Sequence, residues 1–169
     1  MMSLRCGILT VSDRSSRGER LDRSGPALVE KITTQGWQVE RVDIVPDDYQ
    51  VLVDTLVKWG DSGELDVILT TGGTGFSPRD VTPEATAAVV ERSAPGLGEA
   101  MRSESLKITP YAMLSRAVAG IRGRTLIINL PGSPKGALEN LTVILPVLPH
   151  AVELLQEAEN AEAGHRMVR

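Results

Sequence analysis

The chain has 169 residues, the size of one ordinary domain with a single substantial core. Hydrophobic residues make up 41% of it but aromatic residues only 3%, so the core must consist mainly of aliphatic side chains. Scarce aromatic rings, a net charge of −4 and the lack of a basic run argue against a protein that binds nucleic acid.

The cysteine and histidine content and the hydropathy of the chain exclude further classes of protein and site. A single cysteine, Cys6, excludes an intramolecular disulfide framework and a thiolate zinc site, and its apolar surroundings predict a small buried side chain. His150 and His165 lie far in sequence from the glycine-rich segment described below, which argues against a catalytic histidine. The sequence has no apolar signal-peptide core, and no run approaches the roughly 20 apolar residues of a membrane span. We therefore expect a cytoplasmic enzyme or binding domain.

The first half of the chain alternates between strand and helix patterns. In chain order, the predicted elements are a strand at 4–11, a helix at 26–35, a strand at 39–45, a helix at 49–59 and a strand at 66–70. The first strand is nearly all apolar, which predicts burial on both faces. The polar segment 12–25 is long enough to predict a functional loop, and Gly36 is typical of a helix end.

The second half contains a hairpin pattern among helices. The predicted elements are helices at 83–92 and 97–106, a short helical piece through Met113, strands at 117–121 and 125–130, and helices at 135–145 and 148–159. Gly123 predicts a tight turn between the two strands, so one strand of the sheet should be antiparallel. Residues 1–160 should form a single domain and residues 161–169 a frayed tail.

Strands that alternate with helices predict a three-layer α/β/α sandwich with a mostly parallel sheet and one antiparallel strand. Ligands of such folds bind beyond the carboxyl ends of the strands, near a switch in strand order. Four loops should therefore meet at one edge of the sheet. These loops are 12–14, 46–48, 72–80 and 131–136.

The most specific pattern lies between Thr70 and Thr86, TTGGTGFSPRDVTPEAT. It follows an apolar strand, places three glycines in four positions, and reaches a helix start at Thr82-Pro83. Such a turn lets backbone N–H groups face an anion, and the carboxylate of Asp80 could hold Mg²⁺ beside it. The pattern indicates phosphate chemistry, but it is neither a Walker A loop nor the dinucleotide-binding fingerprint.

Each candidate acid also has an ordinary structural alternative. Asp80 could cap the following helix or pair with Arg79, and Asp47 could be the N-cap of the helix that follows it. In the segment 130–136, LPGSPKG, a capping serine and a nearby lysine suit either an anion site or a simple connector. The segment Ser12-Asp13-Arg14 is equally ambiguous. The residues alone leave these alternatives open.

Two long segments resemble the molybdopterin adenylyltransferase family, in particular the G domains of gephyrin and its relatives. They are the glycine-rich segment above and PGLGEAMRSESLKITPYAMLSRAVAGIRGRTLIINLPGSPKG; the shorter SDR and VPDD segments also match. The resemblance covers roughly residues 4–155. It implies a cytoplasmic homotrimer that acts late in molybdenum cofactor synthesis and passes its product to a separate molybdate-insertion enzyme; composition and hydropathy, as above, predict that it binds neither nucleic acid nor membrane.

The implied reaction transfers AMP from Mg-ATP to the terminal phosphate of molybdopterin, which gives adenylyl-molybdopterin and pyrophosphate. By resemblance, Asp80 and Asp47 are the catalytic acids and ligands of Mg²⁺. The implied residues for binding substrate and nucleotide are Ser12, Asp13, Gly72, Gly73, Thr74, Gly75, Pro131, Gly132, Ser133 and Lys135. A binding or scaffold domain without catalysis is the alternative, although retention of both acids favours an enzyme. The apolar residues of 101–113 could form a trimer surface or belong to the core.

Overall fold

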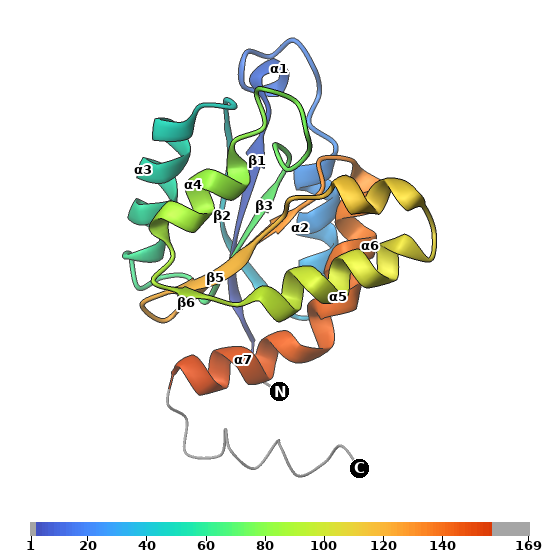
Figure 1. The fold of residues 1–169 in the computed structure, drawn as a ribbon. Helices are drawn as coiled ribbons and strands as arrows, with labels where there is room; N and C mark the ends of the chain where they lie inside the picture. Colours follow the sequence, from blue (N-terminus) through green and yellow to red (C-terminus); the bar gives the residue numbers. More distant parts are fainter. Residues whose placement is uncertain (1–2, 157–169) are drawn as a thin grey trace.

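The computed structural model describes residues 3–156 and contains a six-stranded sheet between two layers of helices (Figure 1). The strand order is β2-β1-β3-β6-β5-β4. The strands are β1 (Arg5–Val11), β2 (Gln38–Val45), β3 (Val67–Thr71), β4 (Arg92–Ser93), β5 (Ala119–Arg122) and β6 (Thr125–Leu130). Strand β5 runs antiparallel to both of its neighbours, and all other pairs are parallel. The predicted fold, with one antiparallel strand, is confirmed.

Two groups of helices cover the two faces of the sheet (Figure 1). The helices are α1 (Asp13–Ser16), α2 (Ser24–Thr34), α3 (Tyr49–Gly60), α4 (Thr82–Val89), α5 (Pro95–Leu106), α6 (Pro134–Ile144) and α7 (Leu148–Leu155), with 3-10 helices η1 (Pro110–Leu114) and η2 (Leu145–Val147). Helices α3 and α4 pack on one face, and α2, α5, α6 and α7 pack on the other. The predicted helix end at Glu159, the predicted domain boundary at residue 160, the predicted tail at 161–169 and His165 lie outside the described residues.

The two cores follow from the side-chain alternation of the central strands. Adjacent residues of one strand point to opposite faces, so Ile68 packs with α3 and α4 while Leu69 packs with the other helices. Both are completely buried, as are Ile127 and Ile128 of the neighbouring strand. Cys6 is also buried, as predicted, and burial raises the pKa of its thiol to about 12. The site is therefore built on three central strands, β1, β3 and β6, whose residues are almost all buried.

The polar segment 12–25 is more ordered than a loop. It contains the short helix α1, because the Ser12 hydroxyl accepts a hydrogen bond from the Ser15 N–H and caps the turn. Helix α2 begins at Ser24, two residues before the predicted start. There the Asp22 carboxylate accepts hydrogen bonds from the N–H groups of Ser24 and Gly25 at 3.0 and 3.1 Å.

The edge strand β4 was missed by the sequence prediction. Residues up to Arg92 were expected to continue a helix, but α4 ends at Val89. The Glu91 N–H donates to the Ile121 carbonyl at 2.8 Å, and the Ala94 N–H donates to the Ala119 carbonyl at 2.9 Å. These two bonds attach the segment to the edge of the sheet, and that tertiary pairing overrides the local helical preference.

The helical stretch Pro134–Leu155 is long and apolar enough to cross a membrane, judged by length and composition alone. In the fold it spans α6, η2 and α7. Its side chains Leu141, Leu148 and Val152 are fully buried in the core on one face of the sheet. Packing on the sheet therefore accounts for the buried part of this stretch, about 33% of its most apolar window.

Candidate active site

A cleft of about 470 Å³, here called the main cleft, lies at the carboxyl ends of β1, β3 and β6. All four loops predicted to meet at this edge contribute to it. Its lining residues are Thr10, Val11, Ser12, Ser15, Arg20, Leu21, Asp22, Arg23, Ser24, Asp47, Thr71, Gly72, Gly73, Asp80, Gly132, Ser133 and Pro134. The two candidate acids and the first two glycines of the turn therefore share one hollow.

The glycine turn is packed against the end of β1 at a distance that only glycine allows. Gly72 has φ +103°, and a Cβ built on it would lie 2.3 Å from the Val11 carbonyl oxygen. The Gly72 N–H donates to the Leu130 carbonyl at 3.2 Å, and its own carbonyl accepts from the Thr82 hydroxyl at 2.9 Å. The predicted role of the Gly72 N–H as an anion donor is therefore wrong, because the fold already uses that group.

The second half of the turn faces a different hollow. Thr74 and Gly75 line a cavity of about 300 Å³, here called the side cavity, on the other side of the turn from the main cleft. Pro131 and Gly136 also line it, and helices α5, α6 and η1 supply the remaining walls. Apart from Asp13 and Lys135, which line neither hollow, the predicted binding residues are divided between two hollows that share the glycine turn and the loop after β6.

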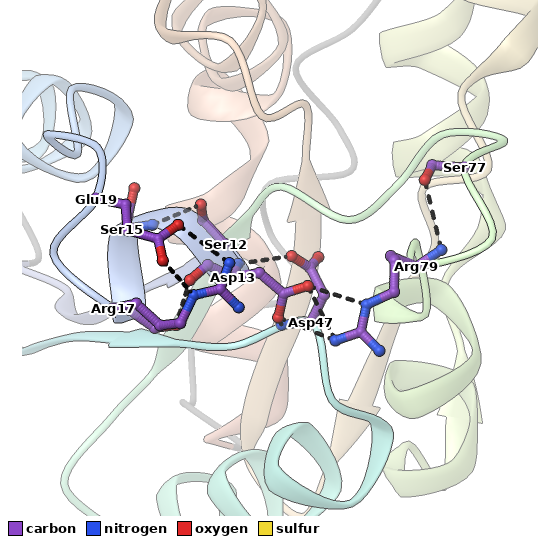
Figure 2. Close-up of polar contacts among 9 residues, drawn as sticks. Ser12, Asp13, Ser15, Arg17, Glu19, Asp47, Ser77 and Arg79 are labelled. Carbon is purple, nitrogen blue, oxygen red and sulfur yellow. Dashed lines mark hydrogen bonds and ion pairs between the residues drawn. The ribbon is translucent and has the colours of Figure 1, made fainter.

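Asp13 and Asp47 are joined by a reciprocal pair of hydrogen bonds (Figure 2). The Asp13 N–H donates to Asp47 Oδ2 at 2.8 Å, and the Asp47 N–H donates to Asp13 Oδ1 at 3.0 Å. The Arg79 guanidinium then donates to both carboxylate oxygens of Asp13, at 2.9 and 3.0 Å. This network ties together the loops after β1, β2 and β3. The Asp13 carboxylate, predicted to bind substrate, instead holds these loops to one another.

Asp47 carries an electrostatic cost in this arrangement. Burial raises the pKa of the Asp47 carboxyl above its ordinary value, and the negative charges of Asp13 and Asp80 raise it further. The hydrogen bond from the Asp13 N–H and the positive charge of Arg79 act in the opposite direction without cancelling the rise. A cation placed in the main cleft would relieve this repulsion.

The alternative that made Asp47 a helix cap is wrong. The N-cap of α3 is Asp48, whose side chain accepts from the Val51 N–H at 3.0 Å. This leaves the Asp47 side chain for the neighbouring loop and the cleft. Its second oxygen, Oδ1, lies 3.1 Å from where a Cβ on Gly73 would stand, and the Thr82 hydroxyl oxygen lies 2.3 Å from the same point, so only glycine fits beside the carboxylate there.

Both alternatives for Asp80 are also wrong. Helix α4 has Val81 at its N-cap position, with no side-chain capping bond, and Arg79 pairs with Asp13 instead of its neighbour. One oxygen of the Asp80 carboxylate accepts from the Ser77 N–H at 3.0 Å, which fixes the side chain within its own loop. Asp80 therefore lines the main cleft without a role in ending a helix.

The loop after β6 matches its predicted local structure. Ser133 caps α6 by accepting from the Gly136 N–H at 3.1 Å. The Lys135 ammonium lies 3.8 Å from Glu139 on the next turn, and the Lys135 side chain is 79% exposed. Lys135 lines neither hollow. Its role in binding phosphate stays a prediction.

Several polar residues of the main cleft were not identified from the sequence. Asp22 accepts a hydrogen bond from the Thr10 hydroxyl at 2.7 Å, and the Ser24 hydroxyl donates to the Gly132 carbonyl at 2.6 Å. Arg20 and Arg23 add positive charge to the same wall. The length of the polar segment 12–25 indicated a functional loop, but no spacing within it distinguished these residues.

No group of three or more His, Cys, Asp or Glu side chains among residues 3–156 has an arrangement that could hold a metal ion by itself. Mg²⁺ is usually bound by one or two carboxylates, with waters and substrate phosphates completing its octahedron. Asp47 and Asp80 fit that smaller ligand set, because they line one cleft and the charge of each raises the energy of the other. The site thus suits a metal that arrives with a phosphate ligand.

Residues 7–150 match a family model described as a probable molybdopterin binding domain. The chain belongs to this family. A molybdopterin adenylyltransferase of Helicobacter pylori is 43% identical over 92% of this chain and 89% of its own. A solved structure titled as the molybdopterin biosynthesis enzyme MoaB from Thermus thermophilus is 52% identical, with a TM-score of 0.86, over 91% of this chain and 97% of that one.

Two relatives of this molybdopterin-binding family are much longer than the chain. Gephyrin of Dictyostelium discoideum is 46% identical over 88% of the chain, and the Drosophila melanogaster protein named molybdenum cofactor synthesis protein cinnamon is 47% identical over 92%. The chain spans only 22% and 26% of their lengths. The similarity to these two therefore concerns one domain of each.

We expect the change Gly72→Ala to destabilise the fold by about 3 kcal/mol, because it adds backbone strain and a clash with the Val11 carbonyl. Urea unfolding measures the effect. The control is Gly63→Ala, at φ +70° with open space around the new Cβ, which should cost only about 1 kcal/mol. Equal losses for the two variants would contradict the close packing of the turn.

The raised pKa of Asp47 predicts that removing its charge stabilises the fold at neutral pH. The ionised carboxylate opposes folding, so its cost appears as the pH rises through the folded-state pKa. Asp47→Asn keeps an acceptor for the Asp13 N–H and removes the charge. Its melting temperature at pH 7.5 should slightly exceed that of the parent chain, with the difference shrinking as the pH falls through that pKa.

Asp61→Asn provides a control of opposite sign for this experiment. The hydrogen bonds from Arg122 lower the pKa of Asp61, so its ionised form favours folding above the unfolded-state pKa. The control should therefore show a lower melting temperature at pH 7.5. A decrease of similar size for Asp47→Asn would contradict the electrostatic cost assigned to Asp47.

Proposed function

We propose that this chain is a molybdopterin adenylyltransferase, which transfers AMP from ATP to the terminal phosphate of molybdopterin and releases pyrophosphate. The observation that carries the proposal is the shared cleft of Asp47, Asp80 and the glycine turn at the carboxyl edge of the sheet. The names of relatives that are 43–45% identical over most of the chain support the same activity.

The residues of the main cleft suit this chemistry. The attacking group is already an anionic phosphate, so the reaction needs no strong general base, and among residues 3–156 no histidine lines the cleft. The protein must hold two polyanions in line and offset the charge that develops on pyrophosphate. Arg20 and Arg23, which line the cleft, supply positive charge for that purpose.

Asp47 and Asp80 would hold Mg²⁺ on the triphosphate. The metal would supply charge neutralisation at the leaving pyrophosphate. The chain itself orients the two carboxylates: the Asp13 N–H fixes Asp47, and the Ser77 N–H fixes Asp80. Burial first, and then the negative charges of Asp13 and Asp80, raise the pKa of Asp47, so a cation bound between the two carboxylates would stabilise the ionised form of Asp47.

The remaining proposals concern assembly and location. We propose a cytoplasmic homotrimer that delivers its product to a separate molybdate-insertion enzyme. The exposed apolar side chains at the end of α5 and along η1 are the candidate subunit interface; they are Leu106, Ile108, Tyr111, Met113 and Leu114. Met101, from the same predicted region, is 1% exposed and belongs to the core.

Replacing Asp80 tests the activity directly. In an assay with molybdopterin and Mg-ATP, the parent chain should yield pyrophosphate together with adenylyl-molybdopterin. Asp80→Asn should lower the turnover at least about 100-fold, because the metal-bound triphosphate loses a charged ligand, while molybdopterin binding stays measurable. Asp54→Asn, on the exposed face of α3, is the control and should keep full activity. Full turnover by Asp80→Asn would remove this residue from the mechanism.

If the exposed apolar side chains of α5 and η1 form the subunit interface, a charged side chain placed among them should disrupt the trimer. Met113 is 66% exposed, and Met113→Glu should convert a trimer into monomers at micromolar concentration, because a carboxylate is costly to bury. Sedimentation equilibrium gives the masses. Val42→Glu, at another exposed apolar position on the edge strand β2, should leave the trimer intact. A monomeric parent chain would contradict trimerisation.

A further inference from the structure

Arg116 lies just before β5 and contacts the loop that carries Asp80 at several points. Its backbone N–H donates to the Thr74 carbonyl at 2.9 Å. Its guanidinium donates to the Gly75 carbonyl at 2.7 Å through Nε and to the Asp80 carbonyl at 2.8 Å through Nη2. The third nitrogen, Nη1, forms an ion pair with Glu84 of α4. One side chain thus binds the beginning and the end of the loop 75–80.

This loop depends on few other contacts. The side chain of Phe76, in its middle, is 68% exposed, so hydrophobic burial does not hold the loop in place. Its internal hydrogen bonds are local, from the Asp80 N–H to the Ser77 carbonyl and from the Ser77 N–H to the Asp80 carboxylate. The long-range contacts are the pair between Arg79 and Asp13 on the outer side and Arg116 on the inner side.

We infer that Arg116 is a positioning residue for adenylyl transfer, which sets the place of the Asp80 carboxylate by holding the Asp80 backbone. The inference rests on the function proposed above. Arg116 lines neither the main cleft nor the side cavity, so it acts on the reaction through Asp80. Because the Gly75 carbonyl is held by the same guanidinium, the distance between the glycine turn and the acid is fixed as well.

The geometry requires arginine at this position. A planar guanidinium presents several N–H groups in fixed directions and can reach two carbonyls and a carboxylate at once. The ammonium of a lysine could keep the ion pair with Glu84 but would not reproduce the fork toward Gly75 and Asp80. Arg116→Lys therefore separates the contacts with the loop from the ion pair with α4.

The test compares Arg116→Lys and Arg116→Gln with two controls. Glu84→Gln removes the ion pair and leaves both carbonyl contacts. Arg122→Gln removes a comparable arginine, which also pairs with a carboxylate and a carbonyl, at the far end of β5 and away from the site. Each variant is assayed for adenylyl transfer with molybdopterin and varied Mg-ATP, for molybdopterin affinity, and for thermal unfolding.

Both Arg116 variants should lower kcat/KM for Mg-ATP by about 10- to 100-fold and raise the Mg²⁺ concentration needed for half-maximal rate. Molybdopterin affinity should stay within about twofold of the parent value, since the proposed metal is held on the triphosphate of ATP. Glu84→Gln and Arg122→Gln should keep the parent kcat/KM and Mg²⁺ requirement, even if their melting temperatures fall as far.

Hydrogen exchange of the ligand-free chain gives a second readout that does not require activity. The N–H groups of Ser77 and Asp80 should exchange at least about tenfold faster in Arg116→Lys, while those of β3 stay protected. Parent-like kinetics and exchange in Arg116→Lys would overturn the inference, as would an equal loss in Glu84→Gln. A parent chain that transfers no AMP would refute the proposed function instead. Hydrogen exchange would still test whether Arg116 holds the loop 75–80 in place.

Discussion

The carboxylates of Asp13, Asp47 and Asp80 lie at one edge of the sheet, and the site depends on the contacts that offset the repulsion among their negative charges. Asp13 is neutralised by the forked contact with Arg79, and its backbone N–H supports Asp47. Asp47 and Asp80 keep their negative charge toward the main cleft, and the raised pKa of Asp47 records the cost. The two cores that cover both faces of the central strands supply the stability that offsets this cost. A site that costs free energy when empty favours occupation by positive charge.

The strand order explains why these residues meet. Strand β1 lies between β2 on one side and β3 on the other: the first crossover takes the chain from β1 to β2, and the second takes it from β2 past β1 to β3. In parallel α/β sheets the loops separate at such a point and leave a crevice beyond the strand ends. The loops after β1, β2 and β3 carry Asp13, Asp47 and Asp80 to that crevice. The loop after β6 closes it with Gly132 and Ser133.

Much of this arrangement was predictable, because the relevant signals are local. Apolar runs identified the central strands, and the spacing of Gly72, Gly73 and Gly75 identified the turn. Topology then placed four loops at one edge. The antiparallel position of β5 followed from a short hairpin with glycine at its turn. Each of these inferences needs only residues that are close in sequence.

The parts that sequence reasoning missed depend on contacts between distant residues. Arg79 was paired with its neighbour as one alternative, but its partner is 66 residues away in Asp13. Arg116 binds main-chain carbonyls, and a carbonyl is present at every residue, so no sequence pattern marks the contact. The cap supplied by Asp48, one position after the expected Asp47, depended on backbone geometry that composition does not specify.

The loops after β3 and β6 touch through Gly72 and Gly132, and this contact has a consequence for sequence change. A Cβ on Gly132 would lie 3.2 Å from the Gly72 Cα, and one on Gly72 would overlap the chain on its other side. Main chain rests directly against main chain there, with no flexible atom to absorb a shift. A methyl group on Gly132 requires the loop after β3 to shift, and one on Gly72 requires the end of β1 to shift, so a homologue that replaces either glycine should also differ in the path of the backbone it meets.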